Sequence, residues 1–371
     1  MRRLLCLAVL LMLPAIILNA QKTGNKYWSS GKLTWEDYTK SSLLADDGNA
    51  SANSFGWETK DTTETFGNLT VHRVTSRVYL DKAKSWVNMD FATPQQLLYN
   101  QLFFDLNELE CRKMLRAIYD PETSFEVGFV QDYYIGVTAA KMSEINITSD
   151  HGNDTATLAY YDAIIQSQLA ALPRGRFNPS GLKKGKHGFG AWGGMGLEFF
   201  LGDPGKYLGT MYSIDFGLRY YYSRFFVDAN FGMGGARSLQ SFNVGNVAVA
   251  GKTALAGLRV GAMAGLNLYD GSWVRIAPMA GIGHNSLGFL EDESDEYSAN
   301  FLKGMRIMAG LDFDLKLDRT AYLYPGDRSI SENCLNIRVY AAKTGFNAGL
   351  DGISINVGIA YACQMWGLKS W

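Results

Sequence analysis

The sequence predicts a chain of two parts, an α+β N-terminal domain followed by an eight-stranded antiparallel transmembrane β-barrel. Three observations carry this prediction: an apolar leader, a polar segment with helical periodicity behind it, and period-two alternation of apolar side chains from about residue 187 onward. With 40 glycines, 8 prolines and 13% aromatic residues, the composition favours many strands joined by close turns over disorder. The net charge of -1 gives no electrostatic footprint for nucleic acid, so no nucleic-acid partner is expected.

Residues 1–20 are expected to be a secretory signal peptide. Arg2 and Arg3 precede an apolar run over 4–18, and Ala20 supplies a small residue for cleavage. A membrane anchor helix is the alternative, but the run contains Pro14 and is shorter than the roughly 20 residues of a spanning helix. A cleaved leader implies export, and we expect the mature chain in the envelope of a Gram-negative cell.

Residues 21–175 are expected to form a periplasmic α+β domain, with a linker at 176–186 and the barrel at 187–371. Thr93-Pro94 is a helix-start signal, and apolar residues recur behind it at a helical period. The expected elements of this domain are strand-like runs over 69–78 and 86–91 and helices over 95–119 and 156–172.

Part of this domain resembles a known family. The segments 85–87 (SWV), 97–109 (LLYNQLFFDLNEL) and 112–113 (RK) resemble an exported bacterial domain family of unknown function. That family opens with a Leu-Thr-Trp segment, similar to 33–35 here, and carries a zincin-like HExxH helix. The resemblance implies a metallopeptidase-like fold for residues 21–175.

The chemistry of that helix is missing from this chain. HExxH holds zinc because two histidines one helical turn apart face the same metal, and its glutamate activates the bound water. Those positions hold Tyr99, Asn100 and Phe103, which supply neither imidazole nor carboxylate. His151 resembles the family's downstream histidine, or it is a loop or helix-capping residue, and a single histidine cannot hold catalytic zinc. We therefore expect a pseudoenzyme without metal or cofactor.

Eight segments that alternate between apolar and polar or small residues are the expected barrel strands. Such a strand has one apolar and one charged face, and nine or more residues suffice to cross a bilayer at a tilt. An even number of strands suits a single-chain bacterial barrel with both ends in the periplasm. The segments are approximately 189–201, 212–221, 225–234, 258–268, 273–282, 300–318, 335–341 and 353–365.

The connections fit this topology with one exception. Short turns are expected at 222–224 and 269–272, and longer outer loops at 236–252 and 283–299. The connection at 318–333 is too long for a periplasmic turn. A soluble β-sandwich is the alternative, but it would place charges in water and apolar groups inside, whereas the expected inner face here is charged or rich in glycine.

The inward positions of these strands carry acidic and basic residues in nearly equal number. Charges persist in such a narrow lumen only as pairs, so the pattern favours a packed interior over an ion path. These features resemble OmpA-type small barrels, and the resemblance implies an anchor with a filled lumen. The expected lumen charges are Glu198, Asp215, Arg219, Asp228, Arg259, Arg275, Arg306, Asp312, Asp314, Lys316 and Arg338.

The same alternation predicts the state of the cysteines. Cys334 falls on an inward position and Cys363 on an outward one, so the two cannot bridge across a regular antiparallel pair. Cys111 is expected to be a buried helix residue. All three thiols are therefore expected to be free.

Taken together, these patterns favour a non-catalytic binding or scaffolding protein anchored in the outer membrane, with its N-terminal domain in the periplasm. The expected partners are outer-membrane lipid and an unidentified periplasmic or outer-membrane protein. A metallopeptidase-like enzyme with unconventional ligands and a small outer-membrane pore are the open alternatives. Asp154-Thr155-Ala156 resembles the short O-glycosylation signal of Bacteroidetes-type bacteria, or Thr155 caps a helix.

Overall fold

The structure, a computed structural model, describes residues 24–40, 51–120, 122–174, 177–245, 247–289 and 302–370. The expected signal peptide and most of the loop expected at 283–299 lie outside these residues. The described residues form two compact units. The first comprises those of Met1–Thr62, Arg73–Phe177 and Leu323–Asp327, and the second those of Thr63–His72, Asn178–Tyr322 and Arg328–Trp371.

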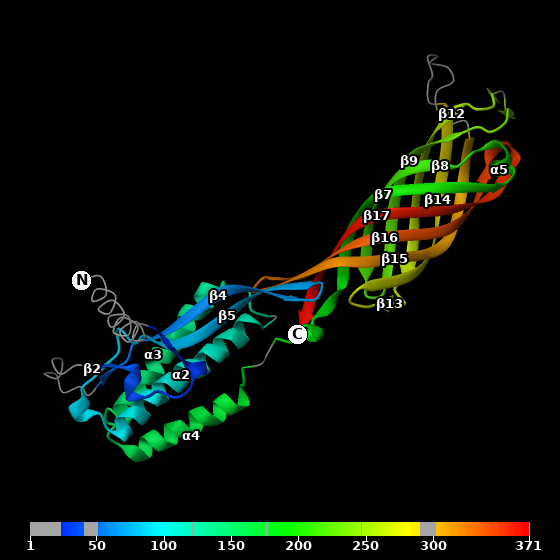
Figure 1. The fold of residues 1–371 in the computed structure, drawn as a ribbon. Helices are drawn as coiled ribbons and strands as arrows, with labels where there is room; N and C mark the ends of the chain where they lie inside the picture. Colours follow the sequence, from blue (N-terminus) through cyan, green and yellow to red (C-terminus); the bar gives the residue numbers. More distant parts are fainter. Residues whose placement is uncertain are drawn as a thin grey trace, which may run out of the picture. The chain divides into compact units, whose positions relative to one another are not determined.

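The first unit is organised around one central helix, α2. One side of α2 packs against strand β5, where Val74 and Val78 share a core with Phe104. Another side packs against α3 and α4. The elements up to residue 177 are β1 (Lys26–Tyr27), β2 (Thr39–Lys40), β3 (Ser51–Ala52), β4 (Phe55–Phe66), β5 (Leu69–Leu80), β6 (Trp86–Val87), α2 (Pro94–Ile118), α3 (Val127–Thr148) and α4 (Thr155–Ala171), with 3-10 turns at Trp28–Ser30, Trp35–Asp37 and Met89–Phe91 (Figure 1).

Two of the helices begin at side-chain caps. The Thr93 hydroxyl accepts a hydrogen bond from Gln96 N at 3.1 Å, and Pro94 occupies the first turn of α2. At α4 the cap is Asp154, whose carboxylate accepts from Ala156 N at 2.9 Å. The interpretation of Thr155 as a cap is therefore wrong, because Thr155 is the first residue inside the helix.

Helix α3 is 22 residues long and was not expected from the sequence. Along it, only Val130, Thr138 and Ile145 are buried, whereas Phe129 and Tyr133 are exposed. Its apolar residues therefore lie on several faces of the helix. A helix without one apolar stripe gives no clear period, which explains why the sequence pattern missed it.

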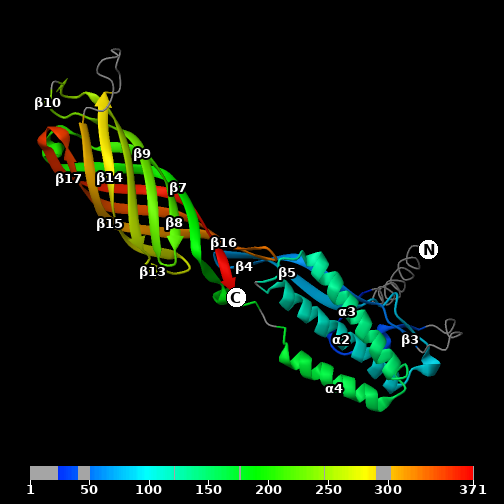
Figure 2. The same cartoon turned by 180° about the vertical axis from the view of Figure 1, so that it is seen from behind.

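The second unit is a closed ring of eight strands in the order β7-β8-β9-β12-β14-β15-β16-β17, with β17 paired to β7 and β15 to β14. Both views show these strands as one tilted barrel (Figures 1 and 2). Its elements are β7 (Lys183–Gly202), α5 (Asp203–Tyr207), β8 (Met211–Tyr222), β9 (Phe225–Arg237), β10 (Phe242–Val244), β11 (Val247–Val249), β12 (Ala254–Leu266), β13 (Tyr269–Asp270), β14 (Val274–Phe289), β15 (Leu302–Tyr324), β16 (Asp327–Phe346) and β17 (Leu350–Ser370), with 3-10 turns at Pro179–Gly181 and Asn347–Gly349.

The two ends of the barrel differ. We call the end at which β7 begins and β17 finishes the terminal end; its connections include the turn at Ser223, where φ is 58°, and Gly326, where φ is 79°. The opposite end, which carries α5, β10 and β11, is the loop end. At the terminal end the tip of the β4–β5 hairpin belongs to the same unit, and Arg319 N donates to Asn68 O at 2.8 Å.

Over most of each strand, side chains alternate between the two faces of the ring. On β15, Met305 and Ile307 are 62% and 66% exposed, whereas Arg306 between them is 2% exposed. A soluble sheet buries its apolar face, and here the apolar face is outside and the charged face inside. Closure, strand length and this inversion make the C-terminal unit a β-barrel of the outer-membrane type.

The expected long connection at 318–333 is wrong. β15 continues to Tyr324 and β16 starts at Asp327, so only two residues join them. The buried positions of β15 are even-numbered up to Lys316 but odd-numbered from Ala321 to Leu323. The change of parity interrupts the period-two pattern, so the sequence no longer indicates a strand there.

The three cysteines among the described residues, Cys111, Cys334 and Cys363, are free, and Cys6 lies outside these residues. Cys334 pairs in register with Ala362 and is buried, whereas Cys363 pairs with Asn333 and is exposed. The opposite orientation of the two side chains confirms the prediction that they do not form a disulfide, and Cys111 is buried in α2 as expected.

Candidate functional site

The interior of the barrel is filled by layers of side chains, and the loop end is closed by an apolar one. Residues of all eight strands of the ring meet there with residues of the segments that connect them. The core of this apolar cap consists of Phe200, Leu208, Met211, Ala236, Phe242, Val244, Val249, Leu255, Leu287, Leu302, Phe346 and Leu350.

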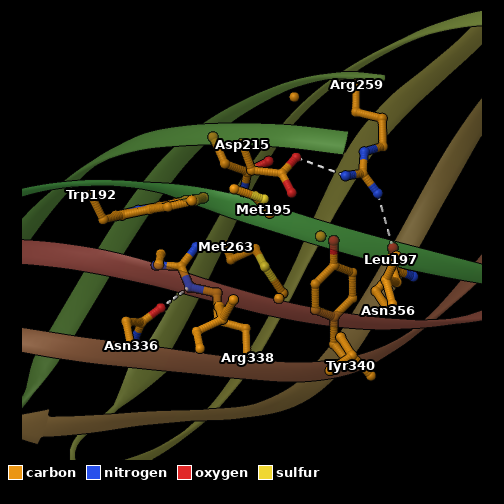
Figure 3. Close-up of a pocket in the computed structure, with 18 of the residues that line it drawn as sticks. Trp192, Met195, Leu197, Asp215, Arg259, Met263, Asn336, Arg338, Tyr340 and Asn356 are labelled. Carbon is orange, nitrogen blue, oxygen red and sulfur yellow. Dashed lines mark hydrogen bonds and ion pairs between the residues drawn. The ribbon is translucent and has the colours of Figure 1, made fainter. Parts of the chain in front are cut away.

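Below the cap, Glu198 organises the first polar layer. Its carboxylate accepts from Arg306 Nη2 at 2.8 Å, Arg259 Nη1 at 3.1 Å and Ser354 Oγ at 2.6 Å, and Glu198 itself is fully buried. Arg259 extends the layer to Asp215, 2.7 Å away (Figure 3). Two acids thus face two arginines from strands spread around the ring.

Asp228 is the centre of the middle layer. It contacts Arg219 and Arg338, each at 2.9 Å, and accepts a hydrogen bond from Trp192 Nε1 at 3.0 Å. The Arg338 guanidinium lies 3.6 Å from the centroid of the Trp192 ring, which supplies a cation–π contact. A Cβ at Gly217 would come within 2.3 Å of the same ring, so this inward glycine makes room for the indole.

Asp312 and Asp314 connect the middle layer to the terminal end. Arg219 reaches Asp312 at 2.5 Å, and Arg275 reaches Asp314 at 2.9 Å. Asn336 donates to both carboxylates, at 2.5 and 2.6 Å. Asp312 and Asp314 therefore share a hydrogen-bond donor, which favours one continuous network of hydrogen bonds and ion pairs over separate pairs.

The layer at the terminal end is built on Glu332. This carboxylate is fully buried and contacts Arg275 at 2.5 Å, Lys184 at 2.8 Å, and Lys316 and Arg319 at 3.1 Å each. Four cations around one acid leave this layer with an excess of positive charge, which is only partly offset by neighbouring Asp270.

The layers leave little free space. A cavity of about 40 Å³ lies between the first and middle layers, next to Arg259, Arg306 and Asn356 (Figure 3). A water molecule occupies roughly 10–15 Å³ by this measure, so the cavity accommodates only a few waters. Asn285 is fully buried, and neither its side-chain oxygen nor its side-chain nitrogen has a hydrogen-bond partner among the described residues.

The structure places every expected lumen residue on an inward position. Asp215 is half-buried, and the other members of the set are buried. The sequence reasoning omitted Lys184, Asp270, Arg319 and Glu332. All four lay in segments assigned to a linker, a turn or a loop. The inward amides Asn336, Asn356 and Gln364 lay within assigned strands, and their alternation would have identified them had neutral residues been considered.

Alternation alone predicts Asp312, Asp314 or a facing aspartate of another strand as the acidic partner of Arg306. The structure instead pairs Arg306 with Glu198 of β7. Six residues of a strand span about 20 Å, so inward residues far apart on one strand cannot meet. Partners instead come from strands across the narrow lumen.

In the first unit, the degenerate motif positions lie on α2 and contribute to its packing. Asn100 is fully buried and accepts from Asn53 Nδ2 at 2.9 Å while it donates to Ser51 Oγ at 3.0 Å. The Phe103 ring lies 4.5 Å from that of Tyr99, within the core shared with α3 and α4. Burial raises the pKa of Tyr99 to about 12, so its phenol is protonated at neutral pH.

His151 and Tyr99 of α2 both contact the side-chain amide of Asn146. Tyr99 OH donates to Asn146 Oδ1, and His151 Nδ1 lies 3.1 Å from the same oxygen. His151 has a φ of 55°, in the turn that follows α3. The structure thus brings Tyr99 and His151 together, whereas Asn100 hydrogen-bonds with Ser51 and Asn53 instead.

The interior of this unit also contains acids. Asp105 accepts from Trp28 Nε1 at 2.6 Å and from Gln101 and Gln166 amides at 2.8 Å each. Its burial raises the pKa of the carboxyl, because these neutral donors compensate desolvation only in part. Glu108 instead forms ion pairs with Arg112 at 2.7 Å and Arg174 at 2.5 Å.

Within the described part of the chain, no group of three or more His, Cys, Asp or Glu residues is arranged to hold a metal ion. In the same residues, no helix is both long and apolar enough to cross a membrane.

No family model matches this chain, and no curated protein matches it. It aligns with several solved structures. Ail, the attachment invasion locus protein of Yersinia pestis, aligns at 13% identity over 49% of this chain and 100% of its own, with a TM-score of 0.30. The outer membrane protein AlkL aligns at 10% identity over 54% and 99%, with a TM-score of 0.28. The outer membrane protease OmpT from Escherichia coli aligns at 10% identity over 52% and 98%, with a TM-score of 0.20.

Proposed function

We propose that this chain is an outer-membrane protein whose barrel acts as an anchor, and that its N-terminal unit is a non-catalytic binding or scaffolding domain in the periplasm. The filled lumen carries the proposal. Four layers of side chains cross the barrel, and the cavity between them measures about 40 Å³. Conduction requires a continuous wet path, which paired charges and an apolar cap oppose.

The outer surface supports insertion in a bilayer. Large apolar side chains project from all eight strands, among them Met195, Leu218, Val227, Ile307 and Ile359. Near the terminal end the exposed surface carries Tyr220, Tyr222, Phe225, Tyr269 and Trp273. Aromatic residues of this kind concentrate where a membrane protein crosses the interface between lipid and water.

Location is tested on the full-length chain expressed with its leader. We expect it in the outer-membrane fraction, with different gel mobility before and after boiling. A detergent-independent soluble pool would contradict the proposal.

The anchor role is tested in planar bilayers, after co-flotation with liposomes has verified insertion. We expect no regular single-channel steps, and reproducible unitary conductance would favour a pore.

The non-catalytic role rests on the packing of α2. Tyr99, Asn100 and Phe103 each contact the protein core through their side chains, so these positions support the fold. Zinc content of the dialysed full-length protein tests this reasoning, with His151→Ala as the matched variant. We expect well below one zinc per chain in both. Stoichiometric zinc that the variant loses would indicate an unconventional metal site.

A further inference from the structure

A pocket of about 580 Å³ opens at the terminal end of the barrel unit. We call it the terminal-end pocket. Its lining includes apolar residues, which we call the apolar wall: Phe66, Pro179, Leu182 and Trp273. It also includes basic residues, which we call the basic wall: Lys183, Lys184, Lys316 and Arg319. The Trp273 side chain is 59% exposed, and it lies in the aromatic band of the outer surface described above.

The basic wall carries more positive charge than its acidic neighbours neutralise. Lys184 and Lys316 share Glu332 with Arg319, and both also contact Asp270, Lys184 at 3.1 Å. Lys183 has no acidic partner within the described chain. Four lining cations therefore face two carboxylates, both of which also contact Arg275.

The ionisation of Asp270 is consistent with a positive electrostatic potential at this end of the barrel. It lies in the turn between β12 and β14, where its burial by itself favours the neutral acid. The cations Lys184, Arg275 and Lys316 nevertheless hold the pKa of the Asp270 carboxyl well below its usual range. The cations that line the pocket outnumber these two carboxylates, so the positive charge that remains favours a further anion close by.

We propose that the terminal-end pocket binds a phosphate group, and that its source is the headgroup of an anionic phospholipid. Lysine and arginine side chains donate several charge-assisted hydrogen bonds to phosphate oxygens. The apolar wall beside them suits the glycerol and the first methylene groups of a lipid, which a free phosphate lacks. Basic pockets beside an interfacial tryptophan are typical places for anionic headgroups.

The choice of lipid over soluble phosphate rests on the proposed membrane anchor, whereas phosphate binding itself does not. The probes are short-chain phosphatidylglycerol, short-chain phosphatidylcholine and glycerol 3-phosphate. Each is titrated into the purified full-length protein in neutral detergent, and binding is followed by native mass spectrometry. Gel mobility before and after boiling verifies the folded barrel independently, so failure of the anchor and failure of the pocket are distinguishable.

Lys183→Gln is the main variant, because this exposed side chain can change without affecting the buried network. The control is Lys186→Gln, an exposed lysine of the same strand that does not line the pocket. One Lys or Arg near an anionic lipid surface contributes roughly a fivefold change in affinity. We expect about fivefold weaker phosphatidylglycerol binding for Lys183→Gln and no change for Lys186→Gln. Trp273→Leu should weaken lipid binding and leave glycerol 3-phosphate binding unaffected.

Saturable binding of one phosphatidylglycerol, weakened by Lys183→Gln and by added salt, would support the proposal. Equal affinity for glycerol 3-phosphate would support the phosphate site but overturn its assignment to a lipid. Equal binding of phosphatidylcholine and phosphatidylglycerol, or equal loss in the two lysine variants, would overturn the site itself.

Discussion

Replacing Glu198 with glutamine removes the one carboxylate that contacts Arg306 in the described structure. Arg306 is 2% exposed, so its guanidinium would stay buried with a neutral amide in place of the acid. An uncompensated buried charge costs about 3–5 kcal/mol. Arg306→Ala should cost less, about 1.5–3 kcal/mol, because Glu198 keeps Arg259 as a charged partner and the loss is the hydrogen bonds of Arg306 to Glu198 and Asn356.

The measurement is the free energy of unfolding in detergent micelles, from urea titrations of the parent, both single variants and the Glu198→Gln/Arg306→Ala double variant. The double variant should recover part of the loss, since neither charge then remains, and the cycle should give a coupling of about 1–3 kcal/mol. The control is Lys206→Ala, which breaks an exposed pair with Asp203 and should cost under about 1 kcal/mol. If Glu198→Gln costs no more than this control, the lumen is hydrated and the packed-interior reasoning fails.

Three further outcomes are expected. Phe104→Ala should destabilise the chain by about 3–5 kcal/mol in urea titrations, because this fully buried ring stacks on Phe55 in the core of the first unit. A loss below about 1 kcal/mol would show that neighbouring side chains close the cavity left by the ring. Asp105 has a raised pKa in the folded state, so it binds more protons folded than unfolded, and its contribution to stability is lost as pH rises through the folded pKa. Unfolding free energies of parent and Asp105→Asn should therefore diverge in favour of the variant with rising pH, and parallel curves would contradict this assignment. A membrane-permeant maleimide should label exposed Cys363 in the folded protein and buried Cys334 only after unfolding, as peptide mass spectrometry will show; labelling of both when folded would refute the inward orientation.

Much of the barrel could be predicted because a strand between lipid and a packed lumen has two chemically opposite faces. Met305, Arg306 and Ile307 show this directly, since each side chain's polarity specifies the face to which it points. The alternation of apolar and polar residues gave no prediction where the two faces of a strand do not differ in polarity. It also failed where the buried positions switch from even to odd residue numbers, as in β15 after Lys316. α3 was missed for a related reason, because its apolar residues lie around several faces of the helix.

The partners within the lumen could not be predicted in the same way. The sequence indicated that Arg306 and Glu198 point inward, but inward positions on eight strands offer many combinations. Which two meet depends on strand tilt and on the stagger of the pairing around the closed ring. The hydrogen-bonded register of β7, β15 and their neighbours decides it.

The sequence by itself therefore determined the class of the C-terminal fold, the inward orientation of its charges and the absence of a histidine pair at positions 99 and 103, because these depend on residue type and local period. The tertiary structure decided that Arg306 meets Glu198 and that Glu332 gathers four cations. It also decided that the tip of the β4–β5 hairpin belongs to the barrel unit. Such contacts join segments far apart in the chain, and no local pattern encodes the closure that brings them together.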